Sequence, residues 1–194
     1  MTPEETLAAY LHRARDALIW KLEGLDDYDV RRPLTATGTN LLGLIKHTAL
    51  VSADYLGDIF GRPFEHPMTA AIGEGAAPND DMWAPADESR QDVVDLWDAA
   101  WMHIDATLAA VELDASGEVP WWPPERNPVT LHQVIVHVLA ELHRHAGHAD
   151  IVRELIDGAA GASPAFGNLP DVDPTWWSDY VERVEAAART AADR

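Results

Sequence analysis

Residues 130–158, TLHQVIVHVLAELHRHAGHADIVRELIDG, decide the fold and carry most of the reactive side chains of this sequence. The spacing of their apolar residues predicts a helix. Thr130 can cap its start, with Gln133 three residues later to close a capping box. Gly158 suits the residue that follows a helix C-terminus. We therefore expect one long helix across the whole stretch.

Five of the nine histidines of the chain lie in this helix. At 100° per residue, four potential ligands share a wedge of about 80° on one face; these are His137, Glu141, His145 and His148. Such a stripe is a poor core and suits a metal ion. The spacing leaves the ligands open, because His137 and His145 are each four residues from Glu141. His148 could bind the ion or hydrogen-bond to a ligand.

Helical spacing recurs from Thr2 to about Leu25, from about Asn40 to Phe60, with Thr39 as its cap, and from about Asp87 to Val111. A further helical segment starts at Asp173, and no strand is predicted. Two long connections separate these elements. The sequence therefore predicts an all-α fold, a four-helix bundle with long crossover loops and an extra C-terminal helix, in a single domain of residues 1–194.

A third ligand can come from a second helix, because bundles build metal sites from side chains on facing helices. His47 lies on the apolar face of the segment from Asn40 to Phe60, so it is the natural supplier. Trp121 and Trp122 lie in a proline-rich loop, where they either pack the loop or wall a pocket. Three protein ligands would leave coordination positions open, as in catalytic zinc sites.

Composition excludes several classes of partner. The formal net charge is −19, which repels phosphate backbones and anionic lipid, so neither nucleic acid nor a membrane is expected. The absence of cysteine rules out disulfides and a protein thiol nucleophile. No apolar run approaches the roughly 20 residues of a membrane span, and the N-terminal residues lack a signal-peptide pattern. We expect a cytoplasmic protein.

Three motifs resemble the DinB-like superfamily of metal-binding bundles, and more narrowly its DUF664 branch. They are TATGTNLLGLIKHTALVSADYLGDIFGRPF (35–64), DMWAPADESRQDVVDLW (81–97) and VPWWPPERNPVTLHQVIVHVLAELHRHAGHADIVRELIDG (119–158); the late Trp176–Trp177 pair adds to them. The resemblance implies a metal triad of His47, Glu141 and His145. Many relatives have His where Glu141 stands and Gln where His148 stands. His137 then becomes a core residue or a neighbour of the ligands.

Characterised members of this superfamily are transferases and isomerases that use mycothiol, bacillithiol or glutathione. The resemblance thus implies an enzyme with a divalent metal, zinc first and nickel, iron or manganese next, that activates a small thiol, mycothiol in this case, toward an electrophilic substrate. The loops at Arg62–Pro85 and Pro120–Pro128 would wall the pocket. A hydrolase using metal-activated water and a non-catalytic metal-binding stress protein are the alternatives, and either a monomer or a homodimer fits.

Overall fold

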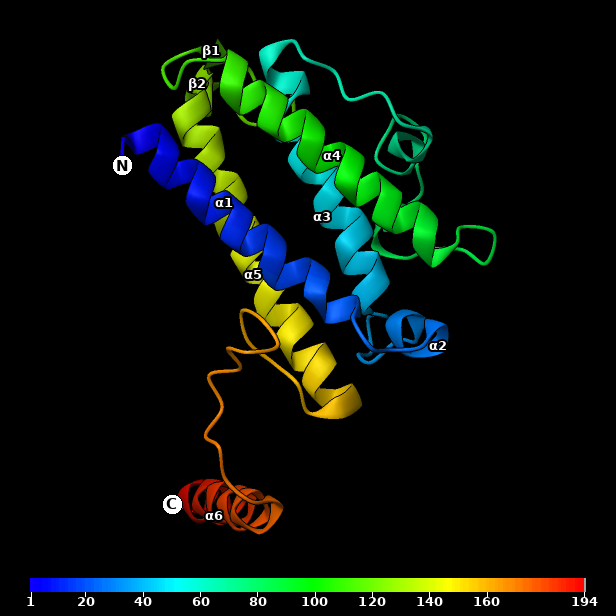
Figure 1. Cartoon of the computed structure of the whole chain (residues 1–194), viewed down its shortest axis with the longest axis vertical. Coiled ribbons are helices and arrows are strands. Elements are labelled where there is room, and N and C mark those ends of the chain that lie inside the picture. Colours follow the sequence, from blue (N-terminus) through cyan, green and yellow to red (C-terminus); the bar gives the residue numbers. More distant parts are fainter. Residues whose placement is uncertain (194) are drawn as a thin grey trace.

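The fold is described from a computed structural model, over residues 1–193 (Figure 1). These residues form six α-helices, and four of them are long helices of the bundle. The helices are α1 (Pro3–Ile19), α2 (Asp27–Arg31), α3 (Leu41–Leu56), α4 (Arg90–Ala110), α5 (Leu131–Asp157) and α6 (Pro174–Ala192). The predicted all-α fold, with a DinB-like bundle and an additional C-terminal helix, is confirmed.

Helix α3 is the centre of the bundle, since it packs against both α4 and α5, and α1 packs against the other side of α5 (Figure 1). Most residues of α3 are buried, among them Leu42, Leu44 and Ile45. A fully buried aliphatic side chain of this size contributes about 1.5–3 kcal/mol to folding. The inner face of α3 is thus held firmly, and side chains on it have fixed positions relative to α5.

The ends of the helices follow local capping rules. Thr2 and Glu5 form the predicted capping box of α1, and Thr130 and Gln133 form that of α5. Gly158 ends α5 in the left-handed conformation, with φ of 80°. Because both ends of α5 are fixed in this way, its histidines lie on one continuous helix.

The predicted bounds of α3 and α4 need correction. Asn40 caps α3 in place of Thr39, because its side chain accepts a hydrogen bond from the amide of Gly43. The α-helix ends at Leu56, and the 3-10 helix η2 (Asp58–Phe60) continues the chain to Gly61. Helix α4 starts later than Asp87, since Ser89 forms the capping box that begins it.

Two small elements lie in stretches expected to be irregular. Helix α2 forms within the connector after α1, where the Asp26 side chain accepts from the amide of Asp29. The prediction of no strand was wrong by one pair, because β1 (Ser116–Gly117) and β2 (Val129–Thr130) pair in antiparallel fashion. This pair closes the base of the proline-rich loop between α4 and α5.

The long crossover between α3 and α4 carries two further 3-10 helices, η3 (Pro67–Ala71) and η4 (Asp80–Met82). The second of these lies directly against α3. At the other end of the chain, α6 lies beyond the bundle, on the side where α5 ends (Figure 1). Over residues 1–193, no helix combines the length and apolar character needed to cross a membrane.

Candidate functional site

Helices α3 and α5 meet along a seam that brings two pairs of aromatic rings together. The rings of His47 and His145 lie 4.8 Å apart between centroids, and those of Tyr55 and His137 lie 4.9 Å apart. Each pair takes one residue from each helix, and the pairs are eight residues apart on both. The helices therefore run antiparallel in a fixed register, which places His47 opposite His145.

His145 is held as a neutral imidazole on the inner face of α5. Its side chain is 12% exposed, and its Nδ1 is buried with no hydrogen-bond partner among the described residues. Burial first, and then the charges of His47 and His148, lower its pKa to about 4. A neutral imidazole with a free ring nitrogen is the form of histidine that binds a metal ion.

Glu141 lies one turn before His145 on the same helix. Its Oε2 is 3.8 Å from His145 Nε2, which is too far for a hydrogen bond, and its side chain is 42% exposed. The carboxylate is therefore not held by His145 and can turn toward a bound metal ion. His148 lies on the other side of His145, with ring centroids 5.4 Å apart.

His47 has a partner that the sequence did not reveal. Its Nδ1 is 2.5 Å from Oδ2 of Asp81, in the 3-10 helix η4. Burial alone would raise the pKa of Asp81, but the hydrogen bond and charge of His47, with the nearby Lys46, hold it below its ordinary value. Asp81 is therefore ionised and accepts the hydrogen bond, and Nδ1 of His47 donates it.

Imidazole nitrogens and a carboxylate are donor groups that suit a divalent metal ion, although these side chains do not converge on one point. Over residues 1–193, no group of three or more His, Asp or Glu side chains has the spacing of a metal centre. His47 and His145 are already in contact, and the unpartnered Nδ1 of His145 is a polar atom that a ligand would satisfy. His47, Glu141 and His145 remain the predicted ligands.

His137 lies two turns from His145 among aromatic side chains. It packs on Tyr55 and, edge to face, on Trp122 at 5.0 Å between centroids. The Tyr55 hydroxyl accepts hydrogen bonds from the indole nitrogens of Trp121, at 2.9 Å, and Trp122, at 3.1 Å. We call these four side chains, His137, Tyr55, Trp121 and Trp122, the aromatic wall.

A cavity of about 290 Å³ extends along α3 beside this wall. Its lining includes Leu50, Asp54 and Trp121. Leu50 and Asp54 lie three and seven residues after His47, so they share its helix face. Burial, with the charge of Asp58, raises the pKa of Asp54 to about 6. The cavity thus offers a carboxyl group and an indole, and neither His47 nor His145 is among its lining residues.

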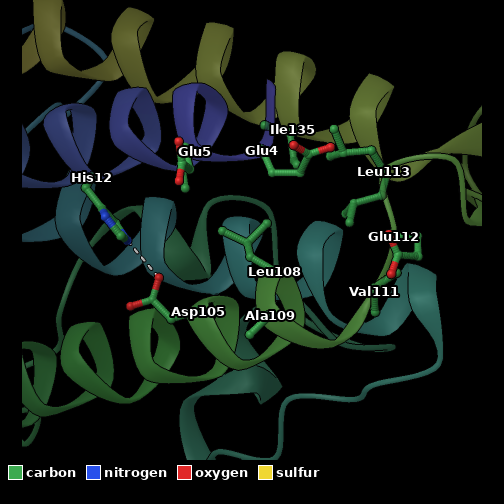
Figure 2. A pocket seen from close by; sticks show the side chains of 12 residues that line it. Glu4, Glu5, His12, Asp105, Leu108, Ala109, Val111, Glu112, Leu113 and Ile135 are labelled. Atoms are coloured by element: carbon green, nitrogen blue, oxygen red, sulfur yellow. Dashed lines mark hydrogen bonds and ion pairs between the residues drawn. The ribbon is translucent and has the colours of Figure 1, made fainter. Parts of the chain in front are cut away.

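His103 and His12, two of the remaining five histidines, have polar partners away from the seam. His103 has its Nε2 2.8 Å from the carbonyl oxygen of Arg62 and donates to it. His12 pairs with Asp105 at 2.7 Å, in a groove of about 530 Å³ (Figure 2). That groove lies among the start of α1, the end of α4 and the start of α5. None of the predicted metal-binding residues lines it.

Sequence reasoning missed Asp81, Tyr55 and Asp54 as residues of this site. Helical periodicity puts Tyr55 on the apolar stripe of α3 and Asp54 on the face of His47, but neither residue type indicates a metal site by itself. Asp81 lies in an irregular crossover, where periodicity carries no information. The one signal at Asp81 was its place at the start of the motif DMWAPADESRQDVVDLW.

A long-helix bundle with facing histidines on its second and fourth long helices defines the class, a DinB-like protein. The family model for mycothiol-S-transferase matches residues 6–158. The chain belongs to the mycothiol-S-transferase family, one of the DinB-like families. The matched range includes both pairs of the α3–α5 seam, the crossover and the aromatic wall, and it ends where α5 ends. A search of curated proteins gave no match.

Proposed function

We propose that this protein transfers mycothiol to an electrophilic small molecule, with His47, Glu141 and His145 holding a divalent metal, zinc first. The observation that carries the proposal is the contact of His47 with His145 across the seam, 4.8 Å between ring centroids. Membership of the mycothiol-S-transferase family supports the thiol and the reaction type. The donor types on the two helices support the metal.

A divalent ion at this place would lower the pKa of a thiol, and thiolate is the nucleophilic form of sulfur. The chain has no cysteine, so the sulfur must come from the co-substrate. In the transfer, the thiol sulfur forms a bond to an electrophilic carbon, and the leaving group departs with the electron pair. The thiol proton passes to solvent or to a nearby base.

The side chains of the chain have distinct tasks in this scheme. His145 stays neutral above pH of about 4, since burial lowers its pKa, and so it keeps a lone pair for the ion. Asp81 holds the ring of His47. We propose that the aromatic wall and the 290 Å³ cavity bind the body of the thiol or the electrophile, because they lie along the same seam and the same face of α3.

The test is a conjugation assay with protein purified without added metal and then analysed for its elements. Metal-free and zinc-loaded samples are mixed with 1-chloro-2,4-dinitrobenzene and either mycothiol, N-acetylcysteine or no thiol. We expect fast conjugation only with zinc and mycothiol together, and we expect His137→Ala to retain zinc.

Failure of zinc-loaded protein to accelerate conjugation with any thiol, over a panel of electrophiles, would overturn the proposal. Hydrolysis of a model ester by the loaded protein in the absence of thiol would instead favour a hydrolase. Metal uptake with neither activity would favour a structural metal site.

A further inference from the structure

The segment 80–83 of the crossover is clamped onto the first half of α3. Asn40 Nδ2 donates to the carbonyl oxygen of Met82 at 3.2 Å. A Cβ atom at Gly43 would overlap that same oxygen, so only glycine lets the segment approach this closely. Lys46 Nζ donates to the carbonyl oxygens of Asp80, at 3.3 Å, and Trp83, at 3.2 Å. The two carbonyls flank Asp81 on both sides.

Lys46 makes this clamp costly to open. The residue is 1% exposed, and its ammonium group pairs with Glu88 Oε2 at 2.8 Å. A buried ammonium is stable only while it is paired and hydrogen-bonded, so moving the segment would leave its charge unsatisfied. The backbone on both sides of Asp81 is therefore fixed relative to α3.

The consequence falls on His47, the next residue after Lys46. Asp81 and His47 have side chains 15% and 20% exposed, and their contact of 2.5 Å is the only hydrogen bond of the His47 ring within residues 1–193. In the neutral imidazole only one ring nitrogen carries the proton, so a ring that donates from Nδ1 to this carboxylate has no proton on Nε2. That nitrogen then has a lone pair for a ligand.

We propose that Asp81 is a positioning residue for His47. It fixes the tautomer and the orientation of the imidazole so that Nε2 binds the metal, and the Asn40, Gly43 and Lys46 clamp fixes Asp81 in turn. Carboxylates that hydrogen-bond to metal-binding histidines have this role in many metal sites. The inference rests on the metal site of the proposed function and names a residue that acts through one of its ligands.

The first measurement is the imidazole ¹⁵N spectrum of metal-free protein at pH 8, with His47 assigned by loss of its signals in His47→Gln. We expect His47 to be protonated on Nδ1 in the wild-type protein and in Asp81→Glu, which keeps the carboxylate. In Asp81→Ala we expect a mixture of tautomers. Asp87→Asn is the matched control, because it removes an exposed carboxylate six residues away.

The second measurement is zinc affinity by competition with a chromophoric chelator. We expect Asp81→Ala to weaken affinity by about 10–100-fold, the usual effect of losing such a partner, with Asp87→Asn unchanged. An unchanged tautomer and an unchanged affinity in folded Asp81→Ala would overturn the inference alone. Complete loss of zinc would overturn it in favour of Asp81 as a direct ligand. If the wild-type protein binds no metal, the proposed function falls, and this inference with it.

Gly43→Ala tests the clamp without touching His47 or Asp81. Circular dichroism first establishes that the variant retains its helices. We expect its zinc affinity to fall in the same direction as that of Asp81→Ala, because the added methyl displaces the segment of Met82. An affinity equal to the wild-type value in a folded Gly43→Ala protein would show that the clamp does not control Asp81.

Discussion

The two ends of the α3–α5 seam have the same geometry and different chemistry. His145 faces His47 at one end, and His137 faces Tyr55 at the other, with ring centroids 4.8 and 4.9 Å apart. Burial is the largest cause of the lowered pKa of His137 and of His145. What separates them is the residue opposite, a second imidazole in one case and a phenol in the other.

This difference shows that a stripe on one helix does not define a metal site. His137 and His145 are both four residues from Glu141 on one face of α5, and by spacing alone they are equivalent. The register of α3 distinguishes them, because it places an imidazole opposite His145 and a phenol opposite His137. We propose that His145 is the metal ligand for this reason. His137 gains packing with Trp122 as well.

The largest expected effect compares His145→Ala with His137→Ala. We expect His145→Ala to weaken zinc affinity by more than about 100-fold, beyond the range for a residue that only supports a ligand. His137→Ala should keep zinc affinity close to the wild-type value, because its ring contacts aromatic side chains. Chelator competition measures both. Equal losses in the two variants, or zinc loss in His137→Ala alone, would show that the ligand set is wrongly assigned.

The next effect is on stability and concerns the aromatic end. Tyr55→Phe keeps the ring but removes the acceptor of two indole hydrogen bonds. We expect the free energy of unfolding to fall by about 1–2 kcal/mol, since Trp121 is 54% exposed and water can replace part of the loss. Urea unfolding measures the change. Zinc affinity should stay the same, and a matching fall in affinity would mean that the two ends are not independent.

The extent to which the sequence predicts this molecule differs between helix and loop. Both ends of α5 and the start of α1 follow from capping residues that act within one turn. The four candidate ligands on α5 follow from a periodicity of 3.6 residues. The start of α3 was missed by one residue because Thr39 and Asn40 are both good caps, and only tertiary contacts choose between them.

The partners across the bundle are beyond such local rules. Asp81 reaches His47 because Gly43 and Lys46, on α3, hold a crossover segment that has no periodic pattern of its own. The pairing of Tyr55 with His137 depends on the register of two helices separated by some 80 residues of chain. Neither feature is encoded within a single stretch of sequence.

A smaller effect compares two carboxyl groups, that of Asp54 on α3 and that of Asp81 on η4, which packs against α3. Burial raises the pKa of Asp54 from 3.8 to about 6, whereas Asp81, paired with His47, has a lowered pKa. Between pH of about 4 and 6, Asp54 is ionised in the unfolded chain but still protonated in the folded protein. The free energy of unfolding therefore falls as the pH rises through this range, and it stays lower above pH of about 6.

Asp54→Asn should therefore stabilise the protein above pH 6, by on the order of 1 kcal/mol once solvent screening of this partly exposed group is allowed for. Well below the ordinary aspartate pKa of 3.8 the variant and the wild-type protein should be equally stable, because Asp54 is then protonated in both states. Urea unfolding at pH of about 7.5 and of about 2.8 measures the difference. A variant that is less stable at pH 7.5 would mean that the Asp54 carboxylate has a stabilising partner.

The smallest effect is expected at the histidine–carboxylate pair outside the seam. His12 and Asp105 are 2.7 Å apart, like a tight ion pair, but their side chains are 37% and 45% exposed. Exposed pairs contribute little, and Asp105 lies in a groove that Glu4, Glu5 and Glu112 also line, so its removal relieves repulsion. We expect Asp105→Asn to change the free energy of unfolding by less than about 0.5 kcal/mol and zinc affinity not at all. A loss of zinc in this variant would show that the exposed His12–Asp105 pair also supports a metal ion. Burial at the seam would then no longer distinguish the proposed metal site from this pair.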